Sequence, residues 1–171
     1  LIPVEDEGRL HDPALRENFI ERIFVFKRWQ EFKSAGGSVG GLVSFHTDHK
    51  LLVMSHSAKH YTVLGSLIAD AKKYPRQALH ENYLATLMEA LRFIATVKKN
   101  TNALRHMTGY FKEQLSKEEK QELQEVIANY HKVLVPLIVP MTLIGHYVKK
   151  YRVEYLKRQY YLNPHPLELM L

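Results

Sequence analysis

The stretch SKEEKQELQEVIANYHKVL, residues 116–134, contains the clearest structural signal in the chain. Ser116 and Glu119 have the S-x-x-E spacing of a capping box, in which each side chain accepts a hydrogen bond from the other residue's backbone N–H at a helix start. From Leu123 to Leu134 apolar residues recur every three or four positions, and Lys and Glu occupy positions on the other side. This pattern predicts an amphipathic helix that begins at Ser116.

Helix-start and helix-stop signals divide the rest of the sequence into further helices. Asp12 before Pro13 is typical of a helix start, and Pro75 is typical of a helix end, because the residue before a proline disfavours helical dihedral angles. The glycine-rich segment 34–41 and the polar segment 100–102 indicate connections. The other expected helices cover residues 13–33, 42–54, 58–74, 77–99, 103–115, 133–148 and 153–160.

The sequence shows no convincing alternation of apolar and polar residues, which is the pattern of a half-buried strand. We therefore expect an all-α fold, a compact bundle of about seven or eight helices with one proline-kinked buried helix at 133–148. That run is almost uncharged, but its length of about sixteen residues is below the roughly 20 that a membrane-spanning helix needs, and Pro136 and Pro140 interrupt it. No membrane association is expected.

With 171 residues, of which 46% are hydrophobic and 25% charged, the chain has the size and composition of one globular domain. We assign residues 12–171 to a single helical domain and residues 1–11, which are acidic and irregular, to an interdomain linker or tail. The N-terminus lacks the basic segment and the apolar run of a signal peptide. We expect a cytoplasmic domain that was excised from a longer protein.

The chain contains no cysteine. Disulfides, thiolate nucleophiles, cysteine zinc sites and Fe–S clusters ligated by this chain are therefore excluded. The composition also fits the reducing environment of the cytoplasm. No cofactor is predicted for this chain.

Positive charge is concentrated in two regions of the sequence. The chain has a net charge of +6, and residues 42–112 hold ten Lys/Arg against four Asp/Glu, while residues 149–171 hold five against two. Tyrosine and histidine accompany these cations, as in Lys59-His60-Tyr61. Cations can neutralise phosphates and aromatic rings can stack on bases, so the pattern favours an RNA partner. Solvated helix faces beside core tyrosines are the alternative explanation.

The stretch FHTDHKLLVMSHSAKHY, residues 45–61, holds four of the ten histidines. His46 and His49 are spaced i, i+3, and His56 and His60 are spaced i, i+4, so each pair shares a helix face and could bind zinc or nickel with a third ligand. No HExxH pattern and no paired nucleophile accompany them. Four interpretations stay open: structural histidines, phosphate contacts, a metal site or an acid–base centre. We favour a stretch that is partly core and partly the rim of an anion-binding face.

Five long motifs, in this order, resemble one known domain family. They are FHTDHKLL (45–52), HSAKHY (56–61), NALRHMTGYFK (102–112), VPLIVPMTLIGHYVKKY (135–151) and YLNPHPLELML (161–171). They are similar to the YbgA-type domain, a bacterial domain of unknown function, over nearly everything from residue 40 onward. The segment PVEDEGRLHDPALRENFIERIF (3–24) resembles the connection that joins this domain to a preceding TudS-type desulfurase domain in fused bacterial proteins.

The resemblance implies a function for the helical domain. The fused proteins are thought to remove sulfur from thiolated uridine in tRNA, with the chemistry in the preceding domain, whose cysteines hold an Fe–S cluster. This chain has no cysteine and cannot carry that cluster. The resemblance therefore implies two partners for it, tRNA and an N-terminal desulfurase domain in the same polypeptide.

The hypothesis that follows is a non-catalytic tRNA-binding accessory domain that holds RNA through phosphate and shape, because no base-reading motif such as an RRM signature is present. The predicted contact residues are His46, His49, Lys50, Lys59, His60, Tyr61, Lys72, Lys73, Arg76, Arg105 and Lys112. A scaffolding domain that packs on the desulfurase domain is the second hypothesis, favoured by the acidic, capped N-terminal segment. A histidine-dependent enzyme or metal protein is the third. The sequence does not determine the oligomeric state.

Overall fold

The computed structural model describes residues 2–166 and 169. In this part of the chain there are eight α-helices, three 3-10 helices and no β-strand. The α-helices are α1 (Pro13–Ser34), α2 (Val39–His56), α3 (Ala58–Ala69), α4 (Arg76–Leu91), α5 (Val97–Thr108), α6 (Lys117–His131), α7 (Ile138–Lys150) and α8 (Glu154–Lys157). The 3-10 helices are η1 (Gly8–His11), η2 (Ala71–Lys73) and η3 (Gly109–Phe111). The expected all-α bundle of about seven or eight helices is confirmed.

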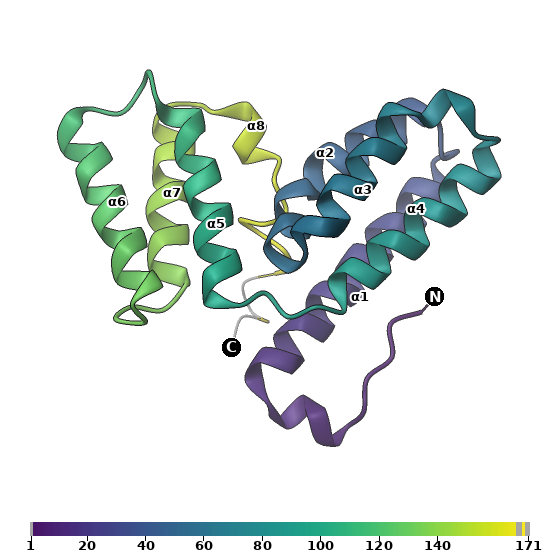
Figure 1. The fold of residues 1–171 in the computed structure, drawn as a ribbon, viewed down its shortest axis with the longest axis horizontal. Coiled ribbons are helices and arrows are strands. Elements are labelled where there is room, and N and C mark those ends of the chain that lie inside the picture. Colours follow the sequence, from purple (N-terminus) through teal and green to yellow (C-terminus); the bar gives the residue numbers. More distant parts are fainter. Residues whose placement is uncertain (1, 167–168, 170–171) are drawn as a thin grey trace.

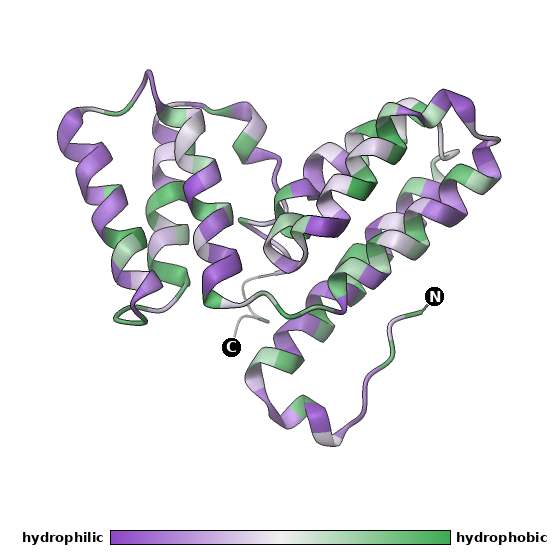
Figure 2. Ribbon diagram, viewed as in Figure 1, coloured by the Kyte–Doolittle hydropathy of each residue, from purple (hydrophilic) through white to green (hydrophobic). Residues whose placement is uncertain are grey.

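The helices form two groups, which we call the first half (α1–α4) and the second half (α5–α8) (Figure 1). In the first half α2, α3 and α4 pack on one another, with α1 against α2 and α4, and in the second half α5, α6 and α7 pack together. The helices α2 and α5 make the main contact between the halves. Hydrophobic residues lie where helices face one another, and the outer sides are hydrophilic (Figure 2).

An aromatic cluster fills the centre of the first half. Trp29 of α1 stacks on Tyr83 of α4 with the ring centroids 5.7 Å apart, and it meets Phe45 of α2 edge to face at 5.5 Å. Aromatic pairs in these geometries contribute about 0.5–1.5 kcal/mol each beyond the burial of their surface. The cluster holds α1, α2 and α4 against one another and so fixes the orientation of the histidines on α2.

The three helix starts predicted from a capping residue, at Asp12, Ser57 and Ser116, are confirmed. The Asp12 carboxylate accepts hydrogen bonds from the N–H groups of Ala14 and Leu15, and Ser57 caps α3. Ser116 and Glu119 form the complete capping box at the start of α6. Each cap satisfies N–H groups that have no partner within the helix.

The prediction of one helix over 77–99 with a turn at 100–102 is wrong. Helix α4 ends at Leu91, and α5 begins at Val97 behind the capping side chain of Thr96. Buried side chains from other helices satisfy the carbonyls exposed by the break: the Asn18 amide donates to the Leu91 carbonyl (2.8 Å), and His56 Nδ1 lies 2.6 Å from the Phe93 carbonyl. Contacts with other helices therefore stabilise a helix end that the local sequence does not predict.

Two further predictions, the proline-kinked helix at 133–148 and the glycine-rich connection at 34–41, also differ from the structure. The prolines do not kink a continuous helix: Pro136 precedes α7 and Pro140 lies in its first turn, where the missing N–H has no helical partner to lose. The glycine-rich connection is shorter than 34–41, because α2 already begins at Val39. Gly37 has φ +54°, and a Cβ there would lie 2.9 Å from the His80 ring, so glycine is required in this turn.

Residues 159–165, which we call the strap, run between the two halves (Figure 1). Gln159 is 1% exposed; its Nε2 donates to the Thr47 carbonyl (2.7 Å) and its Oε1 accepts from the Leu51 N–H (3.4 Å). An uninterrupted α-helix pairs those two backbone groups with each other, since N–H(i) donates to C=O(i−4). The Tyr160 N–H donates to the Asp48 carbonyl at 2.9 Å. The strap is thus part of the hydrogen-bond ladder of α2.

The strap also binds α1 and α5. The Tyr161 hydroxyl donates to Asn100 Oδ1 in α5 at 2.9 Å, and the Arg28 guanidinium of α1 lies 3.7 Å from the centroid of the Tyr160 ring. His165 pairs with the Glu17 carboxylate of α1. Burial alone would lower the pKa of His165, but the Glu17 carboxylate and the Pro166 carbonyl outweigh it and the pKa is raised. One short segment therefore joins three helices from both halves.

The N-terminal segment packs back on α1. Arg22 Nη1 lies 3.3 Å from Glu5 Oε2, and both side chains are largely buried. The assignment of residues 1–11 to an interdomain linker or tail stays a prediction, and the expected domain end at 171, with the end of the motif 161–171, lies outside the described residues. Among the described residues, no helix combines the length and the apolar character needed to cross a bilayer.

Two substitutions at Gln159 should differ sharply in their effect on stability. In Gln159→Ala, α2 can close its own Leu51–Thr47 hydrogen bond, so we expect a loss of only about 1–2 kcal/mol in the free energy of unfolding. In Gln159→Glu, a buried carboxylate faces the Thr47 carbonyl, and the loss should exceed about 3 kcal/mol. Urea denaturation followed by far-UV circular dichroism measures both. Equal losses would show that the strap does not depend on this amide.

Candidate nucleic-acid interface

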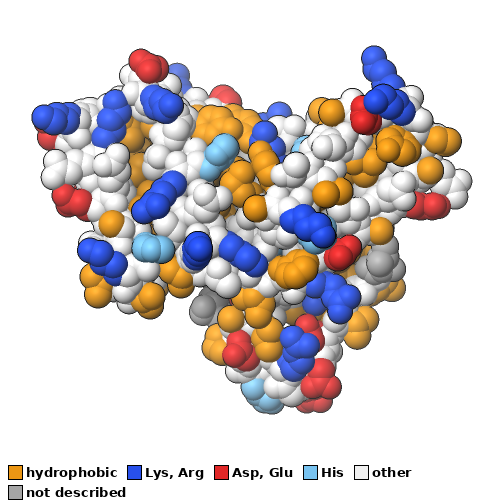
Figure 3. All heavy atoms as spheres, viewed as in Figure 1, with side chains coloured by type: hydrophobic (Ala, Val, Ile, Leu, Met, Phe, Trp, Pro, Cys, Tyr) orange, Lys and Arg blue, Asp and Glu red, His pale blue; other side chains and the backbone are white. Residues whose placement is uncertain are grey.

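Exposed cations gather on the face formed by α3, α4 and α5. In Figure 3, which looks onto this face, Lys and Arg side chains form a row across α5 and the start of α3, and acidic side chains are fewer there. Lys59 of α3 and Lys98 and Arg105 of α5 are exposed. The positive charge of this face comes from the segment 42–112, which carries the excess of Lys and Arg.

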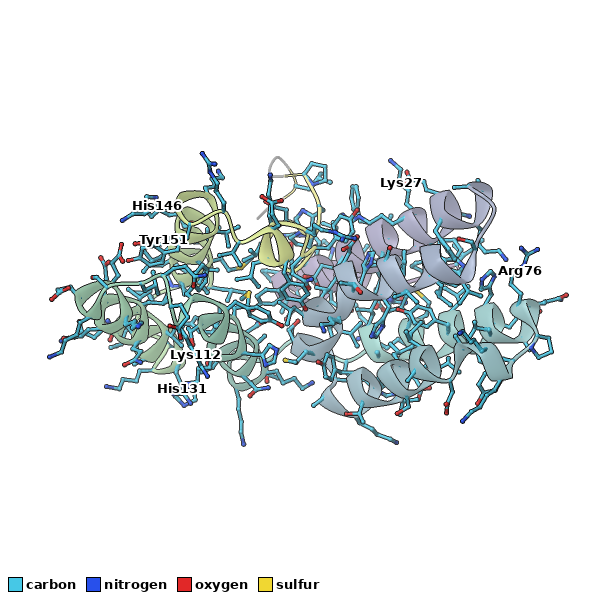
Figure 4. The ribbon with its side chains drawn as sticks, turned by 90° about the horizontal axis from the view of Figure 1, so that it is seen from above. Lys27, Arg76, Lys112, His131, His146 and Tyr151 are labelled. Carbon is cyan, nitrogen blue, oxygen red and sulfur yellow. The ribbon has the colours of Figure 1, made fainter. Side chains whose placement is uncertain are left out.

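The cations predicted to contact phosphate are accessible but do not form one patch. Lys50 is half-buried, and the others are exposed. Arg76 lies at the far end of the first half, whereas Lys112 lies on the second half (Figure 4). We therefore distinguish the tip group, with Lys72, Lys73 and Arg76, from the junction group, with Lys50, Lys59, Arg105 and Lys112.

The tip group is the weaker candidate. Lys72 and Lys73 lie in η2 and Arg76 begins α4, so all three are close in sequence. Lys73 is already paired with the Asp70 carboxylate at 2.7 Å, and this hydrogen bond raises the pKa of Lys73. Apart from the exposed Tyr74, no aromatic residue lies between Lys72 and Arg76 in the sequence.

Three half-buried tyrosines form what we call the tyrosine cluster: Tyr61 of α3, Tyr110 of η3 and Tyr155 of α8. In the sequence, Lys59 lies two residues before Tyr61 and Lys112 lies two residues after Tyr110. Tyr110 and Tyr155 stack with centroids 4.6 Å apart, and Lys50 Nζ lies 5.3 Å from the centroid of the Tyr155 ring. Burial, and then the neighbouring Tyr110, raise the pKa of Tyr61. The phenols are therefore neutral at physiological pH and can donate hydrogen bonds.

The sequence prediction included Tyr61 but missed Tyr155. Tyr155 comes from a part of the chain far from α3, and only folding brings the two residues together. The available signal was the density of tyrosines beside cations in residues 147–161. His106, four residues before Tyr110, contacts the Tyr110 ring edge to face, with the ring centroids 5.8 Å apart.

Two of the predicted contact histidines lie in the interior. His46 is 9% exposed, with Nδ1 3.0 Å from the Tyr83 hydroxyl, and burial followed by the charge of Lys50 lowers its pKa to about 4. His49 is 1% exposed; its Nδ1 donates to the Phe45 carbonyl at 2.7 Å, and its ring stacks on Phe45. Burial lowers the pKa of His49 to about 3. Both histidines are neutral at physiological pH and have structural partners.

His60 is also largely buried. Its Nδ1 lies 2.7 Å from the Ser57 hydroxyl and its Nε2 lies 3.5 Å from the Glu89 carboxylate. The break at Ser57 places His56 and His60 in different helices. Within residues 2–166 and 169, no three His, Asp or Glu side chains converge in a way that could hold a metal ion. The accessible cationic donors of the face are therefore those of the junction group, whereas the Tyr155 hydroxyl is buried and has no hydrogen-bond partner among the described residues.

Comparison with known proteins relates the chain to one family. The family described as "Protein of unknown function (DUF1722)" matches residues 50–166. The chain is 30% identical over 146 residues to "Uncharacterized protein YbgA" of Escherichia coli (strain K12), an alignment that covers 85% of this chain and 86% of that protein. No solved structure matches.

The lowered pKa of His49 predicts a pH-dependent stability. The unfolded chain binds a proton at His49 below about pH 6.5, while the folded state stays neutral until about pH 3, so acid favours unfolding over this window. The stability difference between wild type and His49→Leu should therefore shrink by up to about 1.4 kcal/mol per pH unit as the pH falls from 6.5. Urea denaturation between pH 7.5 and 4.5 measures it. The variant Leu52→Ala, which removes no titrating group, should keep a constant difference, and a constant difference for His49→Leu would contradict the prediction.

Proposed function

The chain belongs to the DUF1722 family, and from this premise we propose that it is a non-catalytic RNA-binding module that contacts RNA with the junction group and the tyrosine cluster. The observation that supports this proposal most is the stacked pair Tyr110–Tyr155 with the Lys50 ammonium beside it. Lys59, Arg105 and Lys112 are further exposed cations of the junction group. Phosphate-neutralising cations next to aromatic rings are the usual combination at single-stranded RNA sites.

The chemistry of this face suits a polyanion better than a small anion. The cations come from α2, α3 and α5 and from the residue after η3, and the Lys and Arg side chains on this face are spread along the surface instead of converging on one point. Each can neutralise a separate phosphate and release its counterions. The half-buried tyrosines offer ring faces to unpaired bases, and every base can stack, so this mode needs no sequence reading.

The proposal extends to the kind of RNA and to its enzyme. The resemblance of residues 3–24 to the segment that follows TudS-type desulfurase domains supports tRNA as the ligand and an N-terminal thiouridine desulfurase domain as the neighbour in the same polypeptide. The chain would then hold the tRNA while the neighbouring domain supplies the chemistry. Its own lack of cysteine is compatible with a non-catalytic role.

A second function, docking on a neighbouring protein domain, is favoured by one observation. Four apolar residues around the turn between α6 and α7 are exposed: Val133 (74%), Leu134 (69%), Ile138 (47%) and Val139 (39%). Val133 also has a left-handed backbone (φ 60°), which is strained for a β-branched residue. A folded chain that binds no tRNA at low salt would favour this docking function over the RNA-binding module.

Binding of unfractionated tRNA, measured by fluorescence anisotropy across a salt series, tests the RNA proposal. We expect the affinity to fall steeply with salt, and the double variant Arg105→Ala/Lys112→Ala should lower the slope of log K against log[salt] by roughly 1.4–1.8, because each lost phosphate contact removes about 0.7–0.9. Lys27→Ala is the matched control, since Lys27 points to the opposite side of the molecule from Lys112 (Figure 4). An unchanged slope in the double variant would remove these residues from the interface.

Replacing Tyr61 separates stacking from charge. Tyr61→Leu keeps the apolar packing of the ring but loses its aromatic face, so tRNA binding should weaken by about 1–3 kcal/mol at every salt concentration with an unchanged slope. Tyr74→Leu is the control, because Tyr74 is an exposed tyrosine beside the tip group. Equal affinity of Tyr61→Leu and wild type would show that the cluster packs the two halves without stacking on RNA.

A further inference from the structure

A cavity of about 510 Å³ opens between the two halves, at the end of α5 opposite the tyrosine cluster. Ala95 and Asn100, at the start of α5, line it, whereas Tyr110 follows the end of the same helix. Its volume lies within the range of about 300–1,000 Å³ that small-molecule sites have. The walls are mostly apolar, with Ile94, Pro136 and Met141 among them, and a few polar side chains line the rest.

The polar part of the wall contains an unsatisfied pair. His56 is 1% exposed, and its Nδ1 lies 2.6 Å from the Phe93 carbonyl, which can only accept, so Nδ1 carries a proton. The Nε2 atom makes no hydrogen bond, although Glu21 Oε2 lies 3.0 Å away. The ring nitrogen and the carboxylate are therefore close to each other without a hydrogen bond between them, which is costly in a buried site.

The other polar groups in the wall bond mainly within the protein. The Asn18 amide donates to the Leu91 carbonyl and its nitrogen lies 3.4 Å from His56 Nδ1, and the Asn100 amide donates to the Ala95 carbonyl. The Tyr161 hydroxyl donates to Asn100 Oδ1, and the Ser55 hydroxyl donates to the Leu52 carbonyl. Among the described residues that line the cavity there is no Lys or Arg. The carboxylates of the wall thus have no Lys or Arg counter-ion within it.

A second carboxylate strengthens the negative character of the cavity. Glu17 lies one helical turn before Glu21 on α1, and both line the cavity. Of the two carboxylate oxygens of Glu17, only Oε1 has a hydrogen-bond partner among the described residues, and that partner is His165 of the strap. Two carboxylates beside an unpaired imidazole nitrogen repel phosphate and attract a ligand that carries both N–H donors and positive charge.

We propose that this cavity binds a compact organic ammonium ion. The ammonium N–H groups donate to Glu21 Oε2 and His56 Nε2, with the Glu17 carboxylate adding charge, and the hydrocarbon part of the ligand packs on Ile94, Pro136 and Met141. An ammonium group has three donors and a positive charge, which matches a wall with two carboxylates and no Lys or Arg among its described residues. This inference goes beyond RNA binding and does not depend on it.

The test compares charged and uncharged ligands of the same shape by ¹H–¹⁵N NMR titration of the full chain. The probes are benzylammonium, 2-phenylethylammonium and cyclohexylmethylammonium chlorides, each paired with the alcohol of the same skeleton. We expect shifts centred on Ala95 and Asn100, and at least one ammonium ion that binds ten times more tightly than its alcohol, a difference of about 1.4 kcal/mol. Equal affinities in all three pairs, or shifts that avoid the cavity, would overturn the proposal.

The variant Glu21→Gln identifies the atoms responsible. Its amide N–H can donate to His56 Nε2, so the variant satisfies the pair internally without a charge, and the preference for the ammonium ion should disappear while the fold is kept. Glu31→Gln, the same change at an exposed position of the same helix, should bind like wild type. Retention of the preference in Glu21→Gln would mean that the ammonium ion is not held by this pair, and the site would have to be abandoned.

Discussion

The amide of Gln159 determines how the two halves of this molecule fit together. It bonds the Thr47 carbonyl and the Leu51 N–H, two backbone groups in the middle of α2, and so ties the strap to the backbone of that helix. From there the strap reaches Asn100 on α5 and Glu17 on α1. Both surfaces discussed above, the tyrosine cluster and the acidic cavity, lie where the halves meet. Their geometry therefore depends on a side chain that contacts neither RNA nor ligand.

Features that rest on local chemistry could be predicted from the sequence. The caps at Asp12, Ser57 and Ser116 need only residues that are close in the chain, and each helix start was found. The end of α4 could not be found in this way, because the groups that satisfy its carbonyls are the Asn18 amide and the His56 ring from distant helices. Likewise the turn expected at 100–102 is helix, since Asn100 faces the buried Tyr161 hydroxyl.

In the candidate site, too, some features could be predicted from local sequence and others depend on contacts between distant segments. The sequence spacing of His46 and His49 predicts that they share one helix face, but it does not determine whether that face is exposed to solvent. In the structure the aromatic cluster around Trp29 covers it. The cations of the junction group are visible in the sequence, because charged side chains are exposed in almost any fold. The tyrosine cluster combines α3, η3 and α8, and no pattern within one segment could bring these residues together.

Helix α5 connects the positive face with the acidic cavity. A helix carries partial positive charge at its first turn and partial negative charge at its last. The first turn of α5 lies beside the cavity with Glu17 and Glu21, whose carboxylates favour the helix dipole, but it also holds Lys98 and Lys99, which oppose it. The last turn holds Arg105, which favours the dipole. At the first turn the attraction and the repulsion of an approaching polyanion therefore offset one another, whereas at the last turn Arg105 attracts it, so the two ends of α5 act differently on the polyanion before contact.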